Sequence, residues 1–129
     1  MANQRGRILE LIEFKRYTGN HYSRESMNDA MGAADRVIVH AIINEISTDV
    51  TVQFGVIAED SSDSENWVEI DPSQPVVGTT VLTEGPSIFR GEVPFPHGRF
   101  LRLRATVASP GTVGTPYATY TMRASLKNS

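Results

Sequence analysis

The stretch Val50–Ile70, VTVQFGVIAEDSSDSENWVEI, decides how the rest of the sequence is interpreted. Its first residues alternate, so Val52, Phe54 and Val56 share one side of an extended strand. An acidic, serine-rich segment follows, and a second extended piece then begins at Trp67. The pattern predicts a β-hairpin in a sheet with one covered face, with Val52, Phe54, Val56 and Trp67 in the core.

The most apolar run, RVIVHAIINEI at 36–46, predicts the strand before this hairpin. It is rich in β-branched residues and too short for a typical surface helix, which favours a strand buried on both faces. Val39 and Ile43 lie on the same side of it and are expected in the core. A Ser-Thr-Asp turn then leads into the next strand, so 36–58 is interpreted as two neighbouring antiparallel strands.

Two later segments complete the strand pattern. In RFLRLRATV, 99–107, Leu101 and Leu103 point to one side, and in YATYTMRASLK, 117–127, Met122 and Leu126 do the same. Prolines and glycines punctuate residues 71–98, which indicates short edge strands and loops. Seven or eight strands with little helix predict an all-β protein, an antiparallel β-sandwich or jelly roll.

The N-terminal third is less regular. Residues 7–17 fit either a strand or a short helix, and the surrounding strand signals favour the strand. Residues 18–35 are polar and small, and they fit either a short helix from Ser23 to Gly32 or an extended arm. We therefore expect one domain over 1–129, with a sandwich core at 36–127 and an irregular segment at 1–35 that serves as an arm or lateral contact.

The composition excludes several classes of site. The 129 residues contain no cysteine, so neither disulfides nor thiolate metal centres can form. A formal net charge of -3 gives no electrostatic reason to expect nucleic acid as a ligand. No apolar run approaches the roughly 20 residues of a membrane span, so no membrane partner is expected. Arginine outnumbers lysine by ten to two, which favours contacts with protein subunits.

Two segments carry a resemblance to known families. An acidic, serine-rich loop that runs into Asn-Trp, EDSSDSENWVEI at 59–70, precedes the aromatic-Leu-Arg-Leu strand at 99–107. Over roughly residues 50–127 this pattern resembles small β-sandwich modules, among them galactose-binding-like jelly rolls and sandwich domains of tailed-phage virion proteins. The resemblance implies the fold. The lack of a signal peptide, linker or catalytic partner in the sequence favours the phage structural subunit over a secreted sugar-binding module.

Charged residues of the arginine-rich strand and of the acidic loop are the interface candidates. They are Arg99, Arg102, Arg104, Asp60, Asp63 and Glu65. Arginines on an outward strand face also act as plain solubility and packing devices, and that interpretation stays open. The acidic loop offers oxygen ligands but lacks the glycine of an EF-hand, so a solvated hairpin tip is expected rather than a calcium site.

No combination of residues indicates catalysis. His21, His40 and His97 are scattered and do not have the spacing of a zinc site. The sequence has no nucleophile elbow, no P-loop and no dinucleotide fingerprint. Trp67 and other aromatic residues could form a sugar-stacking platform, but a lone tryptophan that opens a strand is more often in the core. We expect no enzyme activity, no metal and no cofactor.

These observations predict a non-enzymatic structural subunit of a multi-copy assembly, a phage or phage-like virion component such as a capsid-decoration, neck or tail protein. Its partners would be other copies of itself and other particle proteins, without nucleic acid, membrane or small-molecule ligand. It would be made in the host cytoplasm and reside in the particle. The alternative is a carbohydrate-binding β-sandwich module.

Overall fold

The computed structural model describes residues 7–95, 97–111 and 114–127. In these ranges the chain forms nine strands and one short helical segment. The strands are β1 (Arg7–Tyr17), β2 (Gly19–Tyr22), β3 (Arg36–Ile46), β4 (Gln53–Ser61), β5 (Val68–Glu69), β6 (Val77–Val81), β7 (Ser87–Glu92), β8 (Phe100–Ala108) and β9 (Ala118–Lys127). The 3-10 helix η1 (Glu25–Met27) and the α-helix α1 (Asn28–Ala33) lie between β2 and β3.

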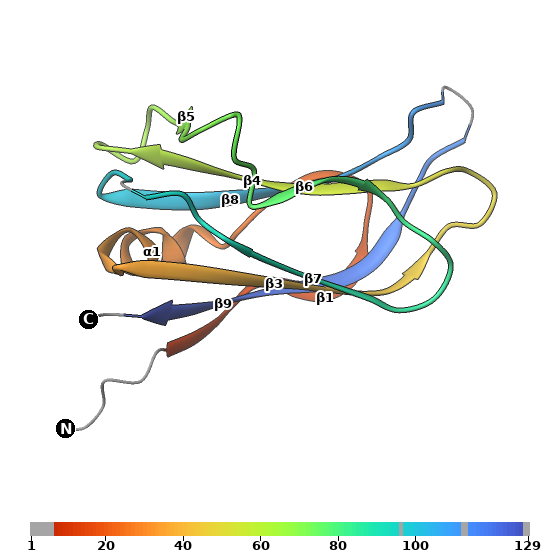
Figure 1. Cartoon of the computed structure of the whole chain (residues 1–129), viewed down its shortest axis with the longest axis horizontal. Coiled ribbons are helices and arrows are strands. Elements are labelled where there is room, and N and C mark those ends of the chain that lie inside the picture. Colours follow the sequence, from red (N-terminus) through yellow and green to blue (C-terminus); the bar gives the residue numbers. More distant parts are fainter. Residues whose placement is uncertain (1–6, 96, 112–113, 128–129) are drawn as a thin grey trace.

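The strands form two antiparallel sheets packed face to face (Figure 1). One sheet has the order β1-β9-β3-β7. In the other, the order is β2-β8-β4, and β5 and β6 both pair along the second edge of β4. The chain passes from one sheet to the other at each step from β1 to β4, and again before and after β7 and β8. This winding is that of a jelly roll, so the predicted fold class is confirmed.

The core lies between the two sheets and is filled by alternate residues of the long strands. On β8, and on β4 over residues 53–58, the inward residues are buried while their neighbours are partly exposed. Most of the core residues expected from the sequence lie in it. They are Val39, Ile43, Val52, Phe54, Val56, Leu101, Leu103, Met122 and Leu126. Because each buried aliphatic side chain contributes about 1.5–3 kcal/mol, these inner faces supply most of the stabilisation.

One expected strand pairing is wrong. β3 pairs with β7 and β9, whereas β4 pairs with β8, so the two strands belong to opposite sheets and are not neighbours. The turn between them carries the chain across the sandwich. β3 also has only one face on the core: Val39 and Ile43 are buried there, while His40 and Ile42 are half-buried on the outer side.

The expected boundary at residue 36 is also wrong, because the sandwich begins at β1. β1 pairs with β9 from Arg7 opposite Leu126 onward, and β2 pairs with β8. Two register shifts interrupt β1, and the adjacent residues Leu11 and Ile12 are both buried. These bulges break the alternation, which explains why the sequence fits both a strand and a helix. Residues 1–6 of the expected arm lie outside the described residues.

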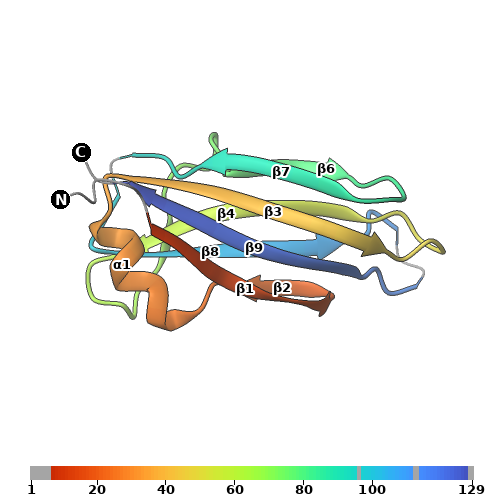
Figure 2. The ribbon, with the colours of Figure 1, turned by 90° about the horizontal axis from the view of Figure 1, so that it is seen from below.

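The helical segment lies at one end of the sandwich, beside the start of β8 (Figure 2). It matches the short helix expected between Ser23 and Gly32, although η1 and α1 divide it into two turns. Met31 is fully buried against the core. A Cβ on Gly32 would overlap the carbonyl oxygen of Arg99, so the absence of a side chain here allows α1 to approach β8 closely.

Candidate functional site

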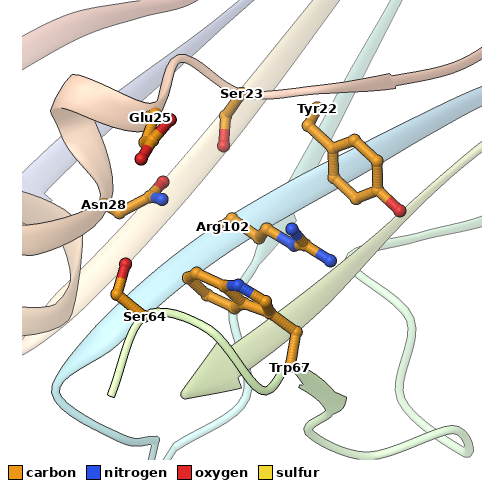
Figure 3. Close-up of a pocket in the computed structure, with 7 residues that line it drawn as sticks. All are labelled: Tyr22, Ser23, Glu25, Asn28, Ser64, Trp67 and Arg102. Atoms are coloured by element: carbon orange, nitrogen blue, oxygen red, sulfur yellow. The ribbon is translucent and has the colours of Figure 1, made fainter. Parts of the chain in front are cut away.

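Two aromatic rings and an arginine form a cluster on the outer face of the β2-β8-β4 sheet (Figure 3). The guanidinium of Arg102 lies between the ring of Tyr22, which ends β2, and the indole of Trp67, which precedes β5. Its central carbon is 4.2 Å and 4.4 Å from the two ring centroids. Such contacts contribute about 0.5–2 kcal/mol each, depending on solvent exposure. We call these three residues the aromatic-arginine cluster.

Glu59 holds the arginine of this cluster in place. It lies directly opposite Arg102 in the register of β4 and β8. Its Oε1 accepts a 2.6 Å hydrogen bond from Nε of Arg102, and its Oε2 lies 3.7 Å from Nη1 of Arg104. The Glu59 side chain is only 10% exposed and that of Arg102 25%, so solvent screens this pair less than the ion pairs elsewhere on the surface.

A cavity of about 240 Å³ lies beside the cluster. It is open to solvent between the segment after β2 and the loop after β4 (Figure 3). Its lining residues are Tyr22, Ser23, Glu25, Asn28, Ser64, Trp67 and Arg102. Asn28 is 5% exposed, and its Oδ1 is buried without a hydrogen-bond partner among the described residues. Since buried polar atoms normally find partners, Asn28 is the unusual group in this wall.

Ser23 takes its position in the wall from the strands beneath it. Its amide donates to the carbonyl of Leu103 at 2.9 Å, and its Oγ accepts from the Leu103 amide, also at 2.9 Å. The pairing of β2 with β8 therefore continues by one residue through a side chain. The amide of Arg24 then donates to the carbonyl of Leu11 on the other sheet, at 3.0 Å, and so turns the chain toward η1.

The opposite wall of the cavity is the loop after β4, and Asp63 organises it. Its Oδ1 accepts hydrogen bonds from the amides of Glu65 and Asn66, each at 2.9 Å, and its Oδ2 accepts from the Asn66 side chain at 2.7 Å. These donors hold the pKa of the Asp63 carboxyl well below its usual range. Ser64, within the loop, has a φ of 64°, a left-handed conformation that is uncommon outside glycine.

The interface candidates of the acidic loop are therefore partly occupied within the chain. Asp63 binds its own loop, and Oδ2 of Asp60 accepts from the amide of Gly98 at 2.6 Å, which ties the loop before β8 to β4. Glu65 is exposed. An intermolecular role for these acids remains a prediction.

The arginine candidates fall into two groups. Arg102 and Arg104 both contact Glu59 and are partly buried. Arg99 is exposed, with its guanidinium 4.9 Å from the ring centroid of Phe100. Only Arg99 of the three therefore presents a charge that no carboxylate of the described residues neutralises, and its role at an interface remains a prediction.

The expectation that Trp67 lies in the core is wrong. Its side chain is half-buried on the outer face of the sheet, against Arg102, and it is absent from the core cluster. The cause is local. The ladder between β4 and β5 is only two residues long and begins after Trp67, so the tryptophan belongs to the loop. The same contact makes Arg102 more than a solvated charge on a strand.

The outer face of the other sheet carries exposed isoleucines. Ile8 of β1 is 74% exposed and Ile88 of β7 is 70% exposed, and Ile42 of β3 lies directly opposite Ile88. All three line one shallow hollow of about 320 Å³, together with His40 and Arg123. Exposed apolar side chains that gather on one face mark contact sites more often than scattered ones do. We call Ile8, Ile42 and Ile88 the isoleucine face.

Within the described ranges, no group of three or more His, Asp or Glu side chains lies close enough to hold a metal ion. The helices of the described chain are too short and too polar for any of them to cross a membrane. The three histidines are separate, with His21 against Tyr17, His40 on the outer side of β3 and His97 beside Phe95.

Sequence reasoning missed three residues of this region. Tyr22 and Asn28 lie in the polar N-terminal third, where no periodicity assigns a side chain to a surface. Glu59 stands at the start of the acidic run and is interpreted with it, although its outward position on β4, opposite Arg102, could have been read from the alternation of both strands. The signal was therefore present only for Glu59.

No protein-family model matches the sequence, and a search of curated proteins finds no match. Solved structures are similar in fold. The CBM22-1 xylan-binding domain of Paenibacillus barcinonensis Xyn10C has 11% identity and a TM-score of 0.60, over 99% of this chain and 100% of that one. The xylan-binding module CBM15 has 10% identity and a TM-score of 0.50, over 96% and 99%.

A chain in the structure of infectious bursal disease virus, Gx strain, has 9% identity and a TM-score of 0.55. The match covers 95% of this chain and 32% of the viral one. At such identities these likenesses show the fold alone. The resemblance to β-sandwich modules of viral particles and of carbohydrate binding is confirmed at that level, and the chain is a jelly-roll β-sandwich.

Proposed function

We propose that this protein is a non-catalytic structural subunit that assembles in many copies through the isoleucine face. The observation that carries the proposal is the exposure of Ile8 and Ile88, 74% and 70%, on the outer face of one sheet. Full burial of an isoleucine contributes about 1.5–3 kcal/mol, and these two side chains have most of that still to gain. A second subunit that covers the face would supply the burial.

Charged residues cross the same face beside the isoleucines. Register places Glu10 of β1 opposite Arg123 of β9, Arg123 opposite His40 of β3, and His40 opposite Arg90 of β7. This row lies between Ile8 and the pair of Ile42 and Ile88, so the face combines apolar and charged groups, as protein interfaces do. The apolar groups supply affinity, while the charges favour one orientation of the partner.

A few isoleucines on a small face give a weak contact, because association costs several kcal/mol of lost translational and rotational freedom. Weak contacts hold subunits when many act together, as in a symmetric particle. We propose that the particle is a phage or phage-like virion in which the chain serves as a capsid-decoration, neck or tail component. The fold shared with a chain of a virus structure supports this proposal. The chain would be made in the host cytoplasm and reside in the particle.

The test is the oligomeric state in solution over a range of protein concentrations, measured by size-exclusion chromatography with light scattering. We expect reversible association that Ile88→Lys abolishes while circular dichroism stays unchanged. Val81→Lys is the matched control, since Val81 is also exposed on a strand but belongs to the other sheet. A monomer at every concentration that also fails to copurify with particles would refute the proposal, as would equal effects of both substitutions.

Carbohydrate binding is the second candidate function. The aromatic-arginine cluster and its cavity favour it, because sugars are held by aromatic faces and convergent polar groups. It uses a different sheet from the isoleucine face, so both functions can coexist. A glycan array with the wild-type chain tests whether any carbohydrate binds.

A further inference from the structure

The cavity beside the aromatic-arginine cluster has the chemical features of a small binding site. Its wall combines hydroxyls of Ser23 and Ser64, the carboxylate of Glu25, the amide of Asn28 and the guanidinium of Arg102. Hydroxyls both donate and accept hydrogen bonds, whereas guanidinium only donates and carboxylate only accepts. A ligand that meets this wall must therefore offer donors and acceptors in close alternation.

Asn28 supplies an amide donor to the wall of the cavity. It is 95% buried, and its amide oxygen is enclosed within the wall, without a partner in the described chain, so a ligand in the cavity would meet the nitrogen side of the amide. A buried amide oxygen without a partner costs about 1–3 kcal/mol. The amide nitrogen side faces Arg102 across the cavity (Figure 3).

The charges around the cavity favour a neutral ligand. Arg102 shares the carboxylate of Glu59 with Arg104, and Glu25 adds a second carboxylate to the wall. Two cations and two anions thus balance. An anion would meet Glu25 and would have to compete with Glu59 for the guanidinium at 2.6 Å. The site therefore disfavours phosphate and sulfate, although it contains an arginine.

The size and lining of the cavity restrict the choice of ligand further. A volume of about 240 Å³ lies below the roughly 300–1,000 Å³ of sites for drug-sized ligands, so it suits one sugar ring better than a larger molecule. The indole of Trp67 borders the cavity and, although the Arg102 guanidinium covers one of its faces, it gives the wall an apolar part that suits the C–H groups of a sugar ring. Arg102 stacks on this indole and is held by Glu59, so the site is formed before a ligand arrives.

We infer that this cavity binds one neutral sugar unit, with Trp67 as the apolar part of its wall and Asn28, Ser64 and Glu25 as hydrogen-bonding groups. The inference revises the expectation that the protein has no small-molecule ligand. It deepens the second candidate function and is independent of assembly through the isoleucine face. The sugar could be free or the end of a surface glycan, since both present the same hydroxyls.

The test measures binding of a panel of neutral monosaccharides to the full chain, followed by the fluorescence of Trp67, the only tryptophan. Immobilised glycans form a second arm and sodium sulfate a third. Asn28→Leu keeps the shape of the side chain and removes its amide. We expect it to weaken binding at least tenfold. Asn44→Leu, at an exposed position of β3, is the matched control and should bind as the wild type does.

Binding of a neutral sugar that Asn28→Leu weakens and Asn44→Leu preserves supports the inference, and the first two arms distinguish a free sugar from a glycan. Tighter binding of sulfate than of every sugar overturns it. Sugar binding that Asn28→Leu leaves unchanged overturns this site but keeps the carbohydrate function. Failure of the wild-type chain to bind any sugar overturns both. Ile88→Lys should leave binding intact, so failure of the assembly proposal is recognised separately.

Discussion

Replacing Arg102 with alanine tests the organisation of the aromatic-arginine cluster. On an exposed strand face such a change is usually within about 0.5 kcal/mol of neutral. Here it removes two cation–π contacts, of about 0.5–1 kcal/mol each, and a charge-assisted hydrogen bond worth about 1.5–3 kcal/mol. Because Arg104 remains 3.7 Å from Glu59 and offsets part of the loss, we expect a destabilisation of about 2–4 kcal/mol.

Arg24→Ala is the matched control. Arg24 donates to Glu10 at 2.8 Å, a distance similar to that of the Arg102 pair, but both side chains are 46% exposed. An exposed ion pair contributes about 0.2–1 kcal/mol, so the control should lose less than about 1 kcal/mol. The two variants differ mainly in burial and in the aromatic rings, which makes the comparison specific for the cluster.

Urea unfolding, followed by circular dichroism and by the fluorescence of Trp67, measures both free energies of unfolding. The fluorescence of the folded state should also change in Arg102→Ala, because the guanidinium leaves the indole. Equal losses of stability in the two variants, or an unchanged tryptophan spectrum in Arg102→Ala, would refute the reasoning.

Three further predictions concern the core, a close backbone contact and pH. The hydroxyl of Tyr120 is buried without a partner among the described residues, so Tyr120→Phe should leave the free energy of unfolding unchanged or raise it by up to about 1–3 kcal/mol; a clear loss in urea unfolding would contradict this. A Cβ on Gly91 would overlap the carbonyl oxygen of Val76, so Gly91→Ala should lower the melting temperature by several degrees. Gly78→Ala is the control, because the space around Gly78 is open, and it should leave the melting temperature unchanged. Similar shifts in both variants would refute the close contact between Gly91 and Val76. Hydrogen bonds to Asp63 depress the pKa of its carboxyl. The stabilisation that the carboxylate gives its loop is therefore present above the ordinary aspartate pKa of about 3.9 and is lost only as the pH falls through the lower pKa of the folded state. An NMR titration of the loop amides measures this, and a midpoint near the ordinary aspartate pKa would disprove it.

Sequence alternation predicted which side of a strand is buried wherever a strand is regular. On β4 and β8 the side chains of Phe54, Val56, Leu101 and Leu103 point inward as the period of two requires. Alternation carries no information about which strands are neighbours in a sheet. The separation of β3 from β4 could therefore not be read from the sequence, since a short turn joins paired strands and strands of opposite sheets alike.

The candidate site was predictable only in part. Arg102 was placed on an outward face, but its contacts come from Tyr22 and Trp67, which lie 80 positions before it and 35 positions before it in the sequence. Long-range contacts of loop residues leave no periodic signal. Asn28 is buried because α1 approaches β8 through Gly32, a tertiary arrangement that local sequence does not encode.

The pairing of the first and last strands has a mechanical consequence. β1 starts and β9 ends at the same pole of the sandwich, with Arg7 opposite Leu126. A force that pulls these two ends apart acts across the strands, parallel to their hydrogen bonds, and therefore loads the bonds one pair after another, as in opening a zipper. The molecule should therefore unfold at low force when it is pulled through its two ends. Pulling on loops at opposite ends of the sandwich shears whole ladders of hydrogen bonds at once, so it should require a much higher unfolding force.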